Sequence, residues 1–177
     1  MFGLLKKKNP YEQDATLVYE RLMEASRKTE FYTDMGVPDT FDGRFDCLVA
    51  HTFIIVEVLK NKDLERAELF NQALFDRIFV QMKITLREIG VGDVGIPKHM
   101  QKMMKAFNGR VHTYSDALNG GDLNAALLRN LYGTVEEPDI EDVDAFANYM
   151  KANLARLGEL DFDEIIVKQE LFELENE

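Results

Sequence analysis

The sequence of 177 residues contains a single cysteine, Cys47, and only three histidines. One cysteine excludes an internal disulfide, and it also excludes a zinc or iron–sulfur site built from several cysteines. The histidines, His51, His99 and His112, follow neither the H-E-x-x-H nor the E-x-x-H spacing, which would place metal ligands on one helix face. The sequence therefore predicts no metal and no other cofactor.

The sequence also lacks a nucleophile motif and a long uninterrupted apolar run. No G-x-S-x-G occurs, and Cys47 lies in an apolar stretch typical of a small buried side chain. The stretch CLVAHTFIIVEVL is interrupted by His51 and Glu57, so it is too short and too polar to span a bilayer and predicts a buried helix. We expect a protein that is not an enzyme.

Negative charge is concentrated at one end of the chain, whose formal net charge is -11. Residues 134–177 hold 14 acidic and 3 basic side chains, whereas residues 1–133 hold 18 of each sign. Phosphate binding needs clustered cations, so this distribution argues against direct DNA binding.

Apolar residues recur at intervals of three and four over most of the chain, which predicts helices. The pattern covers residues 15–25, 41–56, a stretch ending near 88, 98–118, 123–131 and 143–157. Asp39 or Thr40 is placed to cap the second of these. Because no segment alternates with a period of two, we expect an all-α, single-domain bundle of about six to seven helices.

Three regions are predicted: a flexible arm at residues 1–10, a helical domain at 11–160, and an acidic tail at 161–177 that is partly helical or mobile. The arm begins with apolar residues followed by lysines, and it has no signal-peptide cleavage site. Such a sequence suits contact with an anionic membrane or a frayed, solubilising terminus. The membrane-contact hypothesis concerns Phe2, Leu4, Leu5, Lys6, Lys7 and Lys8.

The segment REIGVGDVGIPK (87–98) contains a G-x-G-x-x-G pattern, the spelling of a dinucleotide-binding loop. Such a loop needs a strand before it and a helix immediately after it. Here the preceding segment is helical, Asp93 would repel phosphate, and Pro97 separates the glycines from the next helix. The segment instead predicts a helix-to-helix connection in which Gly90 ends one helix.

Charged residues crowd the beginnings and ends of the expected helices. Arginine and carboxylate groups form directional paired hydrogen bonds. We expect Arg44 or Arg110 to bind Asp39 or Asp93 and so to fix the loops, although an exposed binding epitope is the alternative. The predicted charge network comprises Asp39, Arg44, Arg87, Asp93 and Arg110.

The helix after Pro97 carries lysines on one face and methionines on the other. Lys98, Lys102 and Lys105 are spaced i, i+4 and i+7 and so share a face. Methionine adapts to varied apolar partners, and a lysine rim suits an acidic or membrane-proximal client; a core stripe beside a solvated face is the alternative. The partner-binding hypothesis comprises Lys98, Lys102, Lys105, Met100, Met103 and Met104.

Three stretches resemble the ubiquinol–cytochrome c chaperone family: FYTDMGVPDTFDGRFDCLVAH, LFDRIFVQM and LREIGVGDVGIPKHMQKMMKAFNGR. The D-G-R-F and R-E-x-G-V-G-D motifs, in this order and at this separation, carry the resemblance. It extends from about Tyr19 to Tyr114 and is loose beyond that.

The resemblance implies a non-enzymatic helical chaperone that binds newly made cytochrome b and assists assembly of the ubiquinol–cytochrome c reductase complex (respiratory complex III). It also implies a ribosome or a small partner protein as further partners, because mitochondrial members work with a small protein at the ribosome exit. The alternative is a peripheral membrane adaptor that binds lipid or quinone and has no nascent-protein client.

The family occurs in mitochondria and alphaproteobacteria, and the chain shows neither a mitochondrial presequence nor a long extension. We therefore expect a bacterial member that is cytoplasmic and peripheral on the inner face of the inner membrane.

Overall fold

The computed structural model describes residues 8–174, and over this range the chain forms eight α-helices and no strand. The expected all-α, single-domain fold is confirmed. The bundle has more than the six or seven helices predicted because α2 and α8 have only four and six residues, too few to show a helical period. The helices are α1 (Glu12–Ala25), α2 (Glu30–Thr33), α3 (Phe41–Lys60), α4 (Leu64–Glu88), α5 (Ile96–Leu118), α6 (Leu123–Asn130), α7 (Ile140–Gly158) and α8 (Phe162–Val167).

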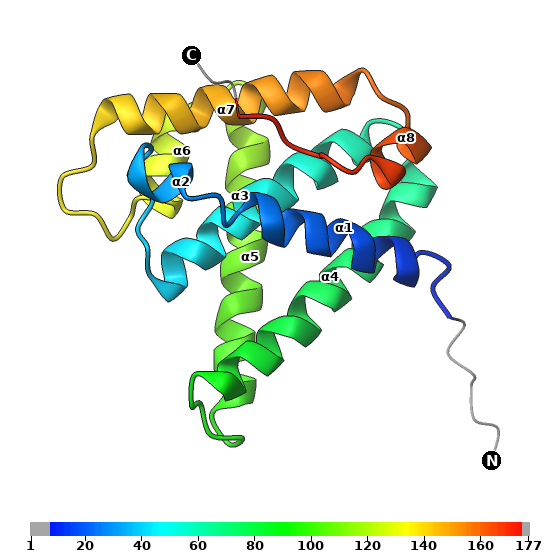
Figure 1. Cartoon of the computed structure of the whole chain (residues 1–177), viewed down its shortest axis with the longest axis horizontal. Coiled ribbons are helices and arrows are strands. Elements are labelled where there is room, and N and C mark those ends of the chain that lie inside the picture. The colour runs from blue at the N-terminus through cyan, green and yellow to red at the C-terminus, as the bar shows by residue number, and fades with distance from the viewer. Residues whose placement is uncertain (1–7, 175–177) are drawn as a thin grey trace.

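Helix α3 lies at the centre of the bundle and packs against α1, α4, α5 and α7 (Figure 1). Every residue from Phe45 to Ile55 is buried, which suits a helix that is apolar around its circumference. The helix begins after Thr40, whose side chain accepts a hydrogen bond of 3.0 Å from the backbone N–H of Gly43. The prediction of a buried helix is confirmed, and Thr40 rather than Asp39 is its cap.

The segment expected as an acidic tail at 161–177 is packed against the domain as far as the structure describes it. Residues 161–174 contain α8 and a segment without regular secondary structure, whose Phe172 is buried. Asn153 of α7 fixes this segment, because its side chain donates to the carbonyl of Glu173 and accepts from the N–H of the same residue, both at 3.0 Å. As far as residue 174 the segment is therefore partly helical, one of the two alternatives expected for it, and the boundary at residue 160 stays a prediction.

The glycine-rich segment connects α4 to α5, as its sequence context predicted. Gly90 has φ 90°, its N–H donates to the carbonyl of Arg87 at 3.0 Å, and the N–H of Val91 donates to the carbonyl of Leu86 at 2.9 Å. This pair of hydrogen bonds is the Schellman motif by which a glycine ends a helix. Pro97 is the second residue of α5, so a helix, not a strand, lies on each side of the glycines.

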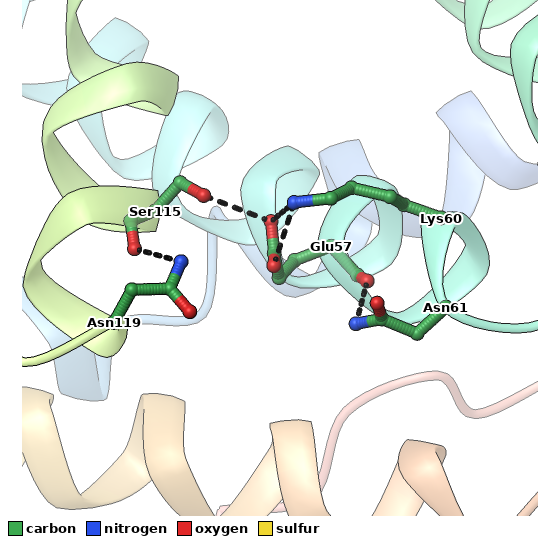
Figure 2. A network of polar contacts seen from close by, with 5 residues as sticks. All are labelled: Glu57, Lys60, Asn61, Ser115 and Asn119. Carbon is green, nitrogen blue, oxygen red and sulfur yellow. Dashed lines mark hydrogen bonds and ion pairs between the residues drawn. The ribbon is translucent and has the colours of Figure 1, made fainter.

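Helices α4 and α5 converge on this connection and form a hairpin that projects from the bundle on the side away from α7 (Figure 1). The opposite end of α5 is attached to α3 by polar contacts (Figure 2). Ser115 donates to the Glu57 carboxylate at 3.3 Å, and Lys60 binds the same carboxylate at 3.1 Å. The N-terminal end of α5 therefore lies in the projecting hairpin, while its C-terminal end is bound to α3 in the bundle.

Candidate functional site

A groove of about 720 Å³ opens between α1, the start of α3 and the end of α4. Its lining includes Tyr19 and Met23 from α1, Phe45 and Leu48 from α3, and Met82 from α4. All of these side chains except Met23 are buried and form the floor of the groove. The exposed apolar area of its lining comes from Phe41 and Ile89.

The two motifs that carry the family resemblance meet at this groove although they lie more than forty residues apart. The D-G-R-F motif contributes Arg44 and Phe45, and the R-E-x-G-V-G-D motif contributes Glu88 and Ile89. Steric constraint explains why the first motif contains a glycine. A Cβ on Gly43 would lie 2.0 Å from the carbonyl oxygen of Pro38. The first turn of α3 can therefore approach the preceding loop only with glycine at this position.

Charged side chains line the groove beside its apolar surface. Arg44 Nε lies 2.6 Å from Asp39 Oδ1, and the hydrogen bond from Arg44 holds the pKa of that carboxyl below its usual range. Both side chains are exposed, so the pair orders the surface more than it stabilises the fold. The remaining charged residues of the lining are Glu20, Glu24, Arg27 and Glu88.

Beneath the start of α3, Asp46 forms an ion pair with Arg110 of α5. The Arg110 Nε lies 2.8 Å from Asp46 Oδ1, and Nη2 donates to Oδ2 at 3.1 Å. Burial raises the pKa of Asp46 to about 7, although Arg110 opposes this shift. The pair connects the helix that begins at the groove to the helix that forms one arm of the hairpin.

Of the pairings expected for Arg44 or Arg110 with Asp39 or Asp93, the structure contains Arg44 with Asp39, whereas Arg110 faces α3 at Asp46. Asp93 lies 17 residues earlier in the chain, a separation of about 25 Å along a helix. Arg87 pairs with Asp93 instead, at 3.1 Å, across the end of the hairpin.

The cysteine and histidine of α3 are enclosed in the core. His51 Nδ1 donates to the carbonyl of Cys47 at 2.8 Å, because a carbonyl can only accept, and Nε2 accepts from the Tyr149 hydroxyl at 2.8 Å. Burial lowers the pKa of His51 to about 4 and raises the pKa of the Cys47 thiol to about 12. The thiol has no exposed surface, so this pair is not arranged for nucleophilic chemistry.

Within residues 8–174, no group of three or more His, Cys, Asp or Glu side chains is arranged to hold a metal ion. No helix among these described residues has the length and apolar character needed to cross a membrane.

The predicted partner-binding residues do not line the groove, to which α5 contributes no side chain. Met103 is buried in the core and Met100 is half-buried, because both face the rest of the bundle, whereas Met104 is exposed. The exposed lysines are Lys98, Lys102 and Lys105. Of the predicted membrane-contact residues, Phe2 to Lys7 lie outside the described residues, and Lys8 pairs with Glu12 at 3.7 Å.

Two features that organise the site were not singled out in the sequence. Asp46 was one of several acidic residues near the start of α3. The sequence feature that could have identified it is its position inside an otherwise apolar run, because a buried carboxylate needs a partner. The close approach of Pro38 to Gly43 had no sequence signal beyond the glycine itself.

Comparisons with known proteins extend the resemblance along the chain. The model of the family described as ubiquinol–cytochrome C chaperone matches residues 33–172, which include α7, α8 and the segment expected as a tail. The match therefore continues well beyond Tyr114.

One curated relative is "Protein CBP3, mitochondrial" from Saccharomyces cerevisiae, which is 24% identical over 135 residues. The alignment covers 73% of this chain but only 40% of the yeast protein, so the chain spans about two fifths of that relative. A solved structure, that of the Cbp3 homolog from Brucella abortus, matches with a TM-score of 0.75 and 32% identity, covering 88% of this chain and 86% of the other.

Proposed function

Because the chain belongs to the ubiquinol–cytochrome c chaperone family, we propose that it is a non-enzymatic assembly factor that binds newly made cytochrome b and assists assembly of the ubiquinol–cytochrome c reductase complex. The proposed location is the cytoplasmic side of a bacterial inner membrane, and a ribosome or a small partner protein is a further proposed contact. The match to the Brucella structure over most of both chains supports a bacterial setting.

The observation that carries the proposal is the meeting of both family motifs at the α1–α3–α4 groove. A client-binding surface needs exposed apolar area that is bordered by polar or charged groups. Phe41 and Ile89 supply exposed apolar area in the groove, and the Asp39–Arg44 pair lies beside it. An apolar segment of a newly made membrane protein suits this chemistry.

A deletion strain tests the function, with levels of cytochrome b and of the assembled reductase complex as the readout. We expect both to fall and the full chain to restore them. Normal levels of both in the deletion strain would contradict the proposed function.

A groove variant tests the surface. Phe41 lines the groove and is partly exposed, so Phe41→Glu places a charge in the groove without disturbing the core. We expect tagged chaperone carrying this change to co-purify at least about tenfold less cytochrome b. The control is Leu64→Glu, an equally apolar exposed position at the other end of α4. Equal capture by both variants would exclude this groove as the client site.

A further inference from the structure

The end of the α4–α5 hairpin carries exposed apolar side chains, most of which do not line the groove. Val94, in the connection, is 97% exposed, the highest value among the large apolar residues that the structure describes. Ile89 is 56% exposed, and Ile84 and Met104, about one to two turns from the connection, are 40% and 39% exposed. Single exposed apolar residues are normal, but here four belong to one projecting end.

The same end is basic, whereas the chain as a whole is acidic. Residues 80–105 contain five Lys or Arg and two Asp or Glu, a net charge of +3, so the rest of the chain carries -14. One of the acids, Asp93, is paired with Arg87. An anionic surface would attract this end and repel the rest of the chain. The molecule would therefore approach with the hairpin facing that surface.

The lysines of α5 lie close enough to the end of the hairpin to interact with a charged surface there. Lys98 and Lys105 are separated by seven residues of α5, or about 10 Å along the helix axis. This distance is close to the Debye length of about 8–10 Å at physiological ionic strength, so all three exposed lysines of α5 would feel a charged surface at the tip.

We propose that the end of the α4–α5 hairpin docks on an anionic lipid membrane. Val94 and Ile89 enter the interfacial region, and the phosphate headgroups attract Lys98, Lys102 and Lys105. Ile89 belongs to both surfaces, since it also lines the groove, so docking places one end of the groove beside the bilayer. Docking itself does not depend on the identity of the client.

Flotation of the full chain with vesicles tests the proposal. We expect the chain to float with phosphatidylcholine vesicles that contain phosphatidylglycerol, to float less as salt is added, and not to float with phosphatidylcholine alone. Lys98→Glu/Lys102→Glu/Lys105→Glu should lower partitioning at least about 100-fold, since each lysine near an anionic surface contributes about fivefold. Val94→Glu should also lower it.

Matched controls separate docking from general changes in charge or stability. Lys62→Glu/Arg129→Glu/Lys151→Glu changes net charge by the same amount at exposed positions outside the hairpin, and Val167→Glu places a charge at an exposed apolar residue of α8. Both should float like the wild-type chain, and circular dichroism should give similar melting curves for all variants.

Three outcomes would overturn the proposal. Unchanged flotation of the hairpin lysine variant would exclude docking by this end. Loss of flotation in Lys6→Glu/Lys7→Glu/Lys8→Glu, with the hairpin variant unaffected, would assign lipid contact to the N-terminal arm. If the hairpin lysine variant floated normally but no longer captured cytochrome b in detergent, these lysines would bind the client and not the membrane. The groove variant Phe41→Glu should float normally, so failure of client binding and failure of docking are distinguishable.

Discussion

Arg110 of α5 binds Asp46 of α3 through two contacts, Nε to Oδ1 at 2.8 Å and Nη2 to Oδ2 at 3.1 Å. The Asp46 side chain is only 7% exposed, so the pair is largely withdrawn from water. Removing one partner of such a pair leaves an uncompensated buried charge, which costs far more than loss of a surface pair. The contact ties the base of the hairpin to the helix that begins at the groove.

The raised pKa of Asp46 predicts a specific pH dependence of stability. Its pKa is about 7 in the folded chain against an ordinary value of 3.8, so the folded state holds the proton more tightly. The resulting stabilisation is complete below about pH 3.8 and is lost as pH rises to about 7. The test is urea unfolding of the wild-type chain and of Asp46→Asn. Across this pH range, the free energy of unfolding of the variant should rise relative to that of the wild type by on the order of 3 kcal/mol. A constant difference between them would contradict the prediction.

His51 should respond to pH in the opposite direction. Burial lowers its pKa from 6.5 to about 4, so the folded state disfavours the charged ring. Its contribution to stability is present above about pH 6.5 and is lost as pH falls toward 4. NMR of the folded chain should show His51 ring resonances that stay constant from about pH 8 down to about pH 5.5. A midpoint near 6.5 for this ring would show that it is accessible to solvent.

The sequence was sufficient for the long helices because each has several turns over which an apolar period repeats. It was insufficient for α2, whose four residues contain barely one turn. Arg44 binds Asp39, five residues away, which was one of the pairings that the sequence left open, whereas the partner of Arg110 depends on how α5 crosses α3. The groove could not be predicted for the same reason, because helix packing brings its two motifs together.

Gly43 and Gly109 are both helical glycines, yet they should respond oppositely to alanine. A Cβ at position 43 would lie 2.0 Å from the Pro38 carbonyl oxygen, so Gly43→Ala must displace the loop or the first turn of α3. We expect a loss of about 2 kcal/mol or more in the free energy of unfolding. No atom outside its own helix lies within 4 Å of a Cβ at position 109, so Gly109→Ala should stabilise by about 0.5–1 kcal/mol. Thermal unfolding compares the two, and a tolerated Gly43→Ala would remove the steric explanation of the first motif.

Asn153 holds the last described segment of the chain in place through reciprocal hydrogen bonds to the backbone of Glu173. This contact keeps Phe172 against the edge of His51, with 4.9 Å between the ring centroids. Asn153→Ala leaves the N–H and carbonyl of Glu173 without these partners, which should lower the free energy of unfolding by about 1–3 kcal/mol.

The loss should be local first, because the segment crosses the surface of α7 at the end of the chain. Amide exchange at Glu173 and trypsin cleavage after Lys168 should both accelerate in Asn153→Ala before global unfolding. The control is Asn124→Ala, which removes an exposed asparagine contact to Asp144 and should change stability by less than about 0.5 kcal/mol. If exchange at Glu173 were equal in the wild-type chain and both variants, the segment would be held by the packing of Phe172 and the contacts of Arg156 with Leu171 and Glu173, and not by Asn153.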